Sequence, residues 1–363
     1  MRFCFDDYQL EFRAQLRAYL EEHCTAREVR AAWTSEHGWS AERWQALARM
    51  GVVGVTVPEE YGGLGLGPVD LVGLLEEAGR AALPEPLLET TGLAAPLLVD
   101  AASGDLPAGR GAICGEWLAR IAGGDAVVTV ALASAPAVPA AAGAHLVLLE
   151  RDGEVRMVDP TAPGVVLTPR RALDGTRRLA VVDADRASST VLATGEEARR
   201  LLSATTERAA LCSAAVLVGL ADRLVTMAAD YARVRHQFGR AIGSFQAIKH
   251  QLADAWVRVE FARPVVYRAA WSLDEDEPSA SRDASMAKAY ASEAAIGAAR
   301  TALQVHGAIG YTWEADLHLW AKRAWALAAS WGDAASHRAR VLSAVVAARA
   351  GAGRPTGAPP RGA

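Results

Sequence analysis

The feature that most constrains the fold of this chain is its C-terminal region, where apolar residues recur at helical spacing from about 199 to 350. The breaks in this pattern are short and rich in glycine or acidic residues, which end one helix and start the next. Long helices joined by short links pack as antiparallel neighbours, so the region predicts a helical bundle. The predicted helices cover 203–238, 244–274, 283–307, 313–330 and 334–349.

The pattern before residue 199 divides into two parts. Helical spacing predicts helices near 6–23, 40–50, 68–81 and 110–122, while the glycine-rich stretch 52–67 predicts an extended, tightly turning segment. Short β-rich runs separated by Pro, Gly and Asp then predict a small antiparallel β-domain. The fold class is therefore mainly α with a small β-domain, and the predicted divisions are an N-terminal α-helical domain, the middle β-domain, the C-terminal bundle and a disordered tail: 1–124, 125–198, 199–350 and 351–363.

Composition excludes several classes of protein. Apolar residues make up 51% and charged residues 22% of the chain, as in globular proteins. The net charge of −4 is spread without a basic concentration, so we expect no nucleic acid partner. The four cysteines lie far apart and predict neither a metal site nor disulfides, and the N-terminus resembles no secretion signal. The widely spaced cysteines are typical of a reduced, cytoplasmic setting. The uncharged run 126–149 contains Pro136 and Pro139, so we expect strands and a loop there rather than a membrane span.

A polar and aromatic cluster separates the first two predicted helices of the bundle. Gly239 and Gly243 predict a tight helix–helix corner, and Ser244 is a candidate N-cap that leaves N–H groups free at the start of the next helix. Such a corner, with Arg235 beside it, can bind a phosphate group. A surface corner held by ion pairs is the structural alternative.

The residues around this corner resemble a known family. The run Arg235-x-Gln-Phe-Gly-x-x-Ile-Gly-x-Phe-Gln is similar to the core of the flavin-dependent acyl-CoA dehydrogenases, and so is the Pro-Glu-x-x-Gly-Gly-Leu-Gly stretch that begins at Pro58. The resemblance is strong over 200–330, good over 50–80 and poor over 125–195. It implies the family's three-part architecture and FAD as cofactor. The family's first flavin-contacting loop, Thr-Glu-Pro-x-x-Gly-Ser, is replaced here by residues 131–139.

The resemblance implies two groups of FAD-binding residues. In the first group, Arg235 would bind the diphosphate, because a guanidinium forks onto phosphate oxygens. The second group would reach the FAD of a neighbouring subunit, which implies an assembly of more than one chain. A structural corner and a helix C-cap are the respective alternatives, and His306 is expected to be a packed side chain. The implied residues are Arg235, Gln237, Phe238, Phe245 and Gln246 in the first group, and Gln304, Gly307 and Ala308 in the second.

The catalytic base is the point at which the sequence departs from the family. Desaturation needs a carboxylate over the α carbon of the substrate. Counting from Gly310, the usual Glu falls on Trp331, whose indole cannot accept a proton, although Gly332 is kept. A minority of the family carry the base in a Glu-Arg pair, which points to Glu207 as tentative base with Arg208. Gapless counting places that base on Ala209 instead, so Glu207 needs a helix that begins after it or an offset. Other candidates are Glu314, Asp333 or no base in this chain.

The function expected from this resemblance is FAD-dependent α,β-desaturation of an acyl-CoA or other acyl thioester. Arg208, Trp331 and Gly332 would contact the substrate, and an electron-transfer flavoprotein or similar acceptor would reoxidise the flavin. The first alternative is a non-catalytic, FAD-sharing partner subunit of a heteromeric acyl-CoA dehydrogenase. The second is altered flavin chemistry. The assembly is either a homo-oligomer or a complex with a homologous chain.

Overall fold

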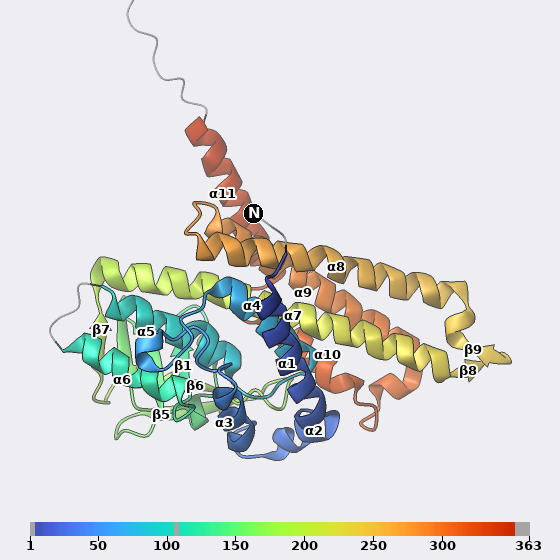
Figure 1. Cartoon of the computed structure of the whole chain (residues 1–363), viewed down its shortest axis with the longest axis horizontal. Helices are drawn as coiled ribbons and strands as arrows, with labels where there is room; N and C mark the ends of the chain where they lie inside the picture. The colour runs from blue at the N-terminus through green and yellow to red at the C-terminus, as the bar shows by residue number, and fades with distance from the viewer. Residues whose placement is uncertain (1–3, 105–108, 353–363) are drawn as a thin grey trace, which may run out of the picture.

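The computed structural model describes residues 4–104 and 109–352, and within them helices dominate over small sheets, as predicted (Figure 1). From residue 353 on, the predicted disordered tail lies outside the described residues. The predicted domain boundaries at 124/125 and 198/199 stay predictions.

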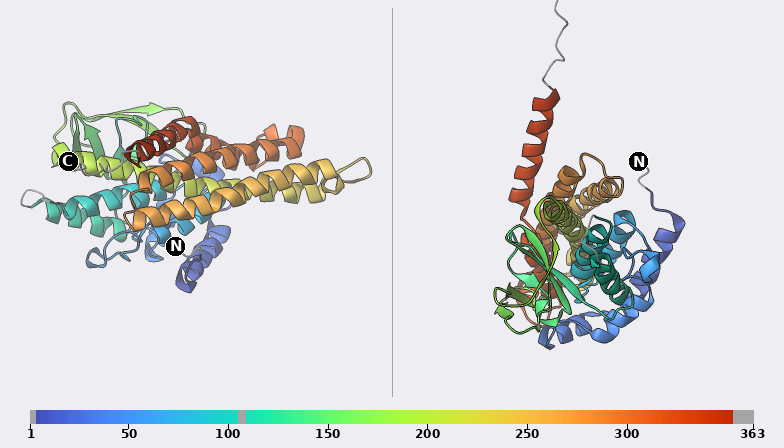
Figure 2. Two further views of the ribbon diagram at one scale, coloured as in Figure 1. Left: turned by 90° about the horizontal axis from the view of Figure 1, so that it is seen from above. Right: turned by 90° about the vertical axis from the view of Figure 1, so that its left-hand side faces the viewer.

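The predicted helical bundle is confirmed. Its five helices are α7 (Gly195–Val234), α8 (Gln246–Asp274), α9 (Ala280–His306), α10 (Leu317–Ala329) and α11 (Ala334–Ala352). Helix α9 packs against the other four, and α11 projects from the body of the molecule (Figures 1 and 2). Small side chains let these helices approach closely, and the alanines of α9 that are buried include Ala284, Ala287, Ala291, Ala294, Ala295, Ala298, Ala299 and Ala302.

Helix α7 differs from its prediction in length. It begins at Gly195, before the predicted start at 203, and it ends at Val234. The helix is long and apolar enough to cross a membrane, but 78% of its most apolar window is buried inside the protein. Helix α7 is therefore a core helix of the bundle.

The predicted helices before the β-region are present, and the structure contains further short helices between them. The predicted helices are confirmed as α1 (Asp7–His23), α3 (Ala41–Arg49), α4 (Pro68–Arg80) and α6 (Arg110–Ala122). Ser40 caps α3 as its spacing indicated: its Oγ accepts the Arg43 N–H at 3.2 Å. The elements that were not predicted are α2 (Ala26–Thr34), the short η1 (Glu59–Tyr61), the π-helix η2 (Leu88–Ala94) and α5 (Ala95–Ala102).

Two glycines explain how closely α4 and α7 cross. A Cβ atom on Gly219 of α7 would lie 1.8 Å from the Glu76 carbonyl oxygen, and one on Gly79 of α4 would lie 2.1 Å from the Val216 carbonyl oxygen. Real Cβ atoms do not approach so closely, so only glycine permits this backbone contact. The crossing fixes the N-terminal helices against the bundle.

The β-region contains two sheets. One has the order β1–β3–β4–β7 and the other β2–β6–β5. The prediction of an antiparallel domain is wrong at one pair, because β1 and β3 run parallel, with Val128 opposite Leu146. Parallel neighbours need a longer crossover, here supplied by β2 and the short η3 (Ala141–Gly143). The strands are β1 (Val128–Ala131), β2 (Val138–Pro139), β3 (Leu146–Arg151), β4 (Glu154–Val158), β5 (Val166–Arg170), β6 (Leu179–Asp183) and β7 (Thr190–Ala193).

One hydrophobic core spans most of the molecule. It joins Leu16 of α1, Leu74 of α4, Val128 of β1 and Ala295 of α9 in a single cluster of buried side chains. A second, smaller cluster around Val147 lies between the two sheets. The first sheet therefore shares its core with the helices on either side of it in the sequence.

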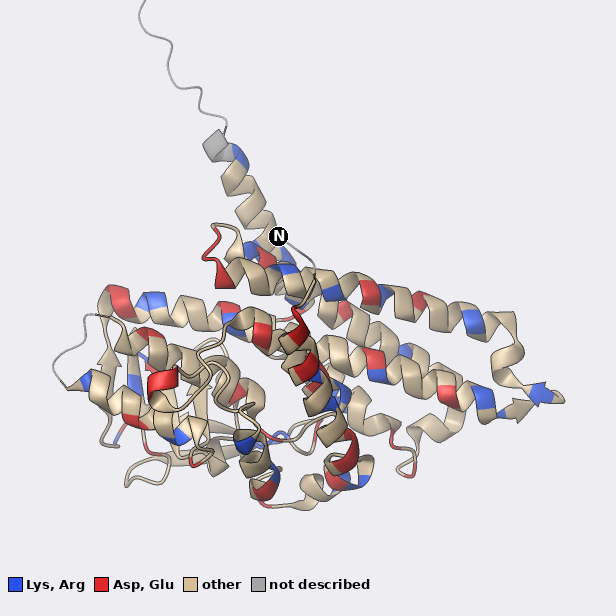
Figure 3. Ribbon diagram, in the orientation of Figure 1, with Lys and Arg blue, Asp and Glu red and all other residues tan. Residues whose placement is uncertain are grey.

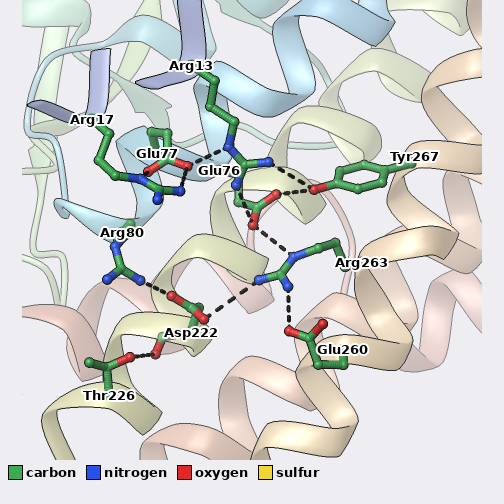
Figure 4. Close-up of polar contacts among 10 residues, drawn as sticks. All are labelled: Arg13, Arg17, Glu76, Glu77, Arg80, Asp222, Thr226, Glu260, Arg263 and Tyr267. Carbon is green, nitrogen blue, oxygen red and sulfur yellow. Dashed lines mark hydrogen bonds and ion pairs between the residues drawn. The ribbon is translucent and has the colours of Figure 1, made fainter. Parts of the chain in front are cut away.

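Buried charges reinforce the contact between the N-terminal helices and the bundle (Figure 4). Arg13 of α1 contacts Glu76 at 2.9 Å and Glu77 at 2.6 Å, both on α4. Glu76 also accepts hydrogen bonds from Tyr267 Oη (2.7 Å) and Arg263 Nε (2.9 Å) of α8. Burial alone would raise the pKa of the Glu77 carboxyl, but Arg17 and Arg13 outweigh it and hold that pKa below its usual value. Both carboxylates are thus paired, which burial demands.

Candidate functional site

The segment after α7 is a β-hairpin rather than the predicted helix–helix corner. Arg235 leaves the helix in an extended conformation, and β8 (His236–Gln237) pairs with β9 (Arg240–Ala241). The two turn residues, Phe238 and Gly239, have φ values of 53° and 78°. Two successive positive φ angles make the tight turn of a two-residue hairpin, a conformation that the helical spacing did not reveal.

The start of α8 also differs from its prediction. The short η4 (Ile242–Ser244) precedes it, and Phe245 occupies the N-cap position. Ser244 is therefore not the N-cap: its Oγ donates instead to the Ala241 carbonyl at 2.7 Å. Gln246 is the first residue of α8 and is exposed.

The hairpin presents side chains that have few partners among the residues that the structure describes. The Arg235 guanidinium is exposed, and no carboxylate within residues 4–104 and 109–352 pairs with it. Phe238, at the tip, is 92% exposed. Arg240 lies 4.1 Å above the Phe245 ring, and Figure 3 shows basic residues at this end of the bundle. An unpaired guanidinium beside exposed aromatic rings suits an anionic ligand that carries its own ring system.

The second predicted group lies at the same end of the bundle. Helix α9 ends at His306, and Gly307 turns the chain into η5 (Gly307–Tyr311) with φ 63° and ψ −142°. The rings of His306 and Tyr231 stack with their centroids 4.3 Å apart, which joins the ends of α9 and α7. His306 Nδ1 also donates to the Ala302 carbonyl at 2.8 Å, so His306 is a packed side chain, as expected. Gln304, Gly307 and Ala308 are all exposed.

Both groups are open to an anionic ligand. Arg235 offers charged donors, and a Cβ on Gly307 would meet nothing within 4 Å, so the turn is open to a ligand. The segment 131–139 does not present the family's flavin-contacting pattern: the Ala133 N–H is already bonded to Glu150 Oε2 at 2.8 Å. The described residues thus leave two exposed segments at one end of the bundle open to a ligand, while the Ala133 N–H is already engaged within the chain.

A cavity of about 160 Å³ lies beside the first half of α7. Thr56 and Leu66 line it from the glycine-rich stretch, Val99 from α5, and Arg208 and Leu211 from α7. Its walls are mostly apolar, as in pockets for small molecules. The cavity thus joins two segments that the sequence singled out separately.

The π-helix η2 gives the cavity its shape. Pro96 has no N–H to donate to the Gly92 carbonyl four residues before it, so a regular α-helix cannot pass through this point. The Gly92 carbonyl instead faces the Cys212 thiol of α7, with Sγ at 3.9 Å. Gly92, Pro96 and Cys212 all line the cavity. Burial raises the pKa of the Cys212 thiol to about 12, so this thiol stays neutral.

Arg208 lines the cavity together with Asp100, with which it forms an ion pair. Its Nη1 lies 2.6 Å from Asp100 Oδ2, and each side chain is 22% exposed. Asp100, on α5, was not predicted, because a pair that spans 108 residues leaves no signal in local spacing. The acidic residue nearest to Arg208 in the cavity wall is therefore already neutralised by it.

Glu207 lies outside this cavity. The helix continues through it from Gly195, so Glu207 does not meet the first of its two conditions, a helix that begins after it, and only an offset remains. Glu207 is half-buried and does not line the cavity, while Ala209 is fully buried. Two residues turn a helix by about 200°. Glu207 and Ala209 thus face different sides of α7.

Trp331 and Gly332 form the turn between α10 and α11. Both have positive φ, 59° and 93°, and His337 Nε2 donates to the Trp331 carbonyl at 2.9 Å. Buried Lys288 of α9 donates to the carbonyls of Leu327 and Ala328, each at 3.0 Å, at the end of α10. This turn is held firmly, but neither Trp331 nor Gly332 lines the cavity beside Arg208.

Two models of a known protein family match this chain, one before the β-region and one after it. The model of the acyl-CoA dehydrogenase N-terminal domain matches residues 6–125, and that of the acyl-CoA dehydrogenase C-terminal domain matches residues 199–346. The chain belongs to the acyl-CoA dehydrogenase family. It is 35% identical to acyl-CoA dehydrogenase IpdE2 of Mycolicibacterium smegmatis over 321 residues, which cover 86% of this chain and 90% of that protein.

Solved structures of this family share the fold. The ChsE4–ChsE5 complex from Mycobacterium tuberculosis matches with a TM-score of 0.84 and 25% identity over 98% of this chain and 100% of that chain. The Tcur3481–Tcur3483 steroid ACAD matches with a TM-score of 0.83 and 27% identity over 95% and 99%. Membership makes this chain an FAD-dependent oxidoreductase of the type that acts on CH–CH groups.

The cavity and the hairpin of this acyl-CoA dehydrogenase are far apart along α7. Arg208 lies on α7, and Arg235 is the C-cap residue of the same helix, 27 residues further along the chain. At 1.5 Å per residue that is about 40 Å. The cavity and the hairpin therefore lie at well-separated points along α7.

Proposed function

We propose that this chain acts in the FAD-dependent desaturation of an acyl thioester between its α and β carbons. The observation that carries the proposal is the apolar cavity at Arg208, because both glycine-rich and helical segments that resemble the family line it. Bound FAD supplies the hydride acceptor for this chemistry. The cavity would hold the acyl group and exclude water from it.

The flavin site is proposed to lie between two chains. The hairpin of one chain, with Arg235, Gln237, Phe238, Phe245 and Gln246, would hold the diphosphate of an FAD whose ring lies over the cavity of another chain. Gln304, Gly307 and Ala308 would complete that site from the same end of the bundle. The separation of about 40 Å along α7 supports this arrangement, as does the likeness to the ChsE4–ChsE5 complex. The second chain is either a copy of this one or a homologue.

The catalytic base is proposed to be Glu207, with Arg208, Trp331 and Gly332 on the substrate side. Because Glu207 does not line the cavity, it acts only if the acyl group reaches its side of α7. The second candidate function is a non-catalytic subunit that shares FAD with a homologous partner that carries the carboxylate. The comparisons favour the first function, and the one structural observation that keeps the alternative in view is that Asp100, the carboxylate in the cavity wall, is paired with Arg208.

The electron acceptor and the cellular setting complete the proposal. Reduced FAD would pass its electrons to an electron-transfer flavoprotein or a similar acceptor. The balanced surface charge suits a cytoplasmic enzyme that binds neither nucleic acid nor membrane.

The proposal is tested by anaerobic titration of the purified protein with acyl-CoAs while the visible flavin spectrum is recorded. We expect a flavin spectrum that bleaches with a thioester, and a rate of bleaching that Glu207→Gln lowers without loss of acyl-CoA binding. A rate that survives Glu207→Gln would contradict the role of Glu207. A protein that binds FAD but is not bleached until a homologous chain is added would establish the partner-subunit function instead.

A further inference from the structure

The cavity beside α7 has few polar groups that are free to meet a ligand. The Thr56 hydroxyl lies in the wall but donates to the Thr91 carbonyl at 2.8 Å. The Cys212 thiol faces the Gly92 carbonyl and stays protonated. Of the polar side chains in the wall, Arg208 and Asp100 therefore remain for recognition.

The Arg208–Asp100 pair leaves hydrogen-bonding capacity unused. A guanidinium has five N–H donors, and the ion pair engages Nη1 of Arg208 with Oδ2 of Asp100. Among the described residues, the Arg208 side chain has no other hydrogen-bond partner and Asp100 Oδ1 accepts no hydrogen bond. The Arg200 guanidinium lies near Asp100 but donates to its backbone carbonyl, at 3.3 Å. An apolar ligand that filled the cavity would displace water from these groups without forming hydrogen bonds to them, so their desolvation would weaken binding.

We propose that the cavity accepts an acyl group that carries a hydroxyl, and that this hydroxyl binds between Arg208 and Asp100. A hydroxyl oxygen accepts from a free N–H of Arg208 while its proton is donated to Asp100, so both halves of the pair gain a partner. A plain methyl end leaves both groups desolvated. A carboxylate end pairs with Arg208 but lies beside the like charge of Asp100. This inference rests on the proposed function, since it takes the cavity to be the acyl site.

The test compares matched CoA thioesters that differ at one end. The FAD-loaded protein, in the assembly in which it purifies, is titrated calorimetrically with straight-chain acyl-CoAs that end in methyl, hydroxyl or carboxylate, in several chain lengths. At the length that reaches the pair, we expect the hydroxyl compound to bind about tenfold more tightly than the methyl compound, because a site built to bond a hydroxyl rejects the analogue that lacks it. The carboxylate compound should bind more weakly than the hydroxyl compound.

Two variants assign the effect to the pair. Arg208→Gln should reduce the preference for hydroxyl over methyl to about twofold or less, since it removes the charged donors. Asp100→Asn removes the repulsive charge and should raise the affinity for the carboxylate compound relative to the methyl compound. Arg199→Gln is the control, because Arg199 lies on the same helix in an exposed pair with Glu196.

The outcomes separate this inference from the function on which it rests. Equal affinity for hydroxyl and methyl compounds at every length, or a preference that survives both variants, would overturn the role of the pair while thioester binding still supports the proposed function. Failure of all the thioesters to bind the FAD-loaded assembly would overturn the proposed function, and this inference with it.

Discussion

Tyr231 and His306 stack with nearly parallel rings, 4.3 Å between centroids and 15° between planes. Tyr231 lies one turn before the end of α7, and His306 is the last residue of α9. The stack therefore fixes the hairpin that follows α7 beside the turn that follows α9. Two groups of residues that are about seventy positions apart in the sequence thus lie together at one end of the bundle.

The proposed role of Arg235 in FAD binding predicts the effect of replacing this residue. Arg235→Gln should lower FAD affinity about 10- to 100-fold, since charge-assisted hydrogen bonds contribute about 1.5–3 kcal/mol. The melting temperature without FAD should not change, because the side chain is exposed and unpaired among the described residues. Arg233→Gln is the matched control, since Arg233 is two residues away and already paired with Asp230 at 2.7 Å. Flavin fluorescence on titration measures both, and equal affinities in the two variants would contradict the assignment.

Two glycine-to-alanine substitutions should have opposite effects on stability, one at Gly307 directly after α9 and one at Gly297 inside it. At φ 63° and ψ −142°, an alanine at position 307 is strained, so Gly307→Ala should cost about 1–3 kcal/mol and weaken FAD binding. Gly297→Ala lies inside the helix with Arg258 Nη1 as its nearest neighbour at 3.4 Å, and should stabilise the protein by up to about 1 kcal/mol. Urea unfolding distinguishes the two. A neutral Gly307→Ala would mean that the turn can rearrange.

The buried pair of α1 and α4 predicts a loss of stability at low pH. Arginines hold the pKa of Glu77 below its value in the unfolded chain, so this carboxylate stabilises the protein above the unfolded pKa, and the contribution is lost as the pH falls through the folded pKa. Glu77→Gln should lower the free energy of unfolding by about 3 kcal/mol at neutral pH and flatten its decline in acid. Glu196→Gln, in an exposed pair, should change it by less than about 1 kcal/mol. Similar losses in both variants would count against the burial argument.

Buried Lys288 predicts that the stability of the protein depends on pH above neutrality. Burial, with Arg177 nearby, lowers the pKa of Lys288 from 10.5 to about 7. Between these two values the unfolded chain binds more protons than the folded one, so the contribution of Lys288 to stability rises with pH. The melting temperature of the wild type minus that of Lys288→Met should therefore increase from about pH 7 to about pH 10. A difference that stays constant over this range would show that Lys288 does not release its proton in the folded protein.

Local spacing predicted those parts of the fold that depend on local hydrogen bonds. The helices of the bundle were predicted because each satisfies its own backbone groups and repeats its apolar residues every turn. Helices α2 and α5 were missed because they are short and their apolar spacing is interrupted, in α5 by Pro96. The parallel pairing of β1 and β3 was missed because strand order is decided by the packing of strands against the helices.

The sequence by itself determined the family, the mainly α architecture and the residues at Arg235 and Gln304 that resemble an FAD site. The tertiary structure alone decided that Arg235 ends a hairpin, that Arg208 pairs with Asp100 in a cavity, and that this cavity lies about 40 Å from the hairpin along one helix. The physical reason is that residue spacing encodes the period of a helix or strand. Contacts between distant segments instead depend on which surfaces the whole chain buries together.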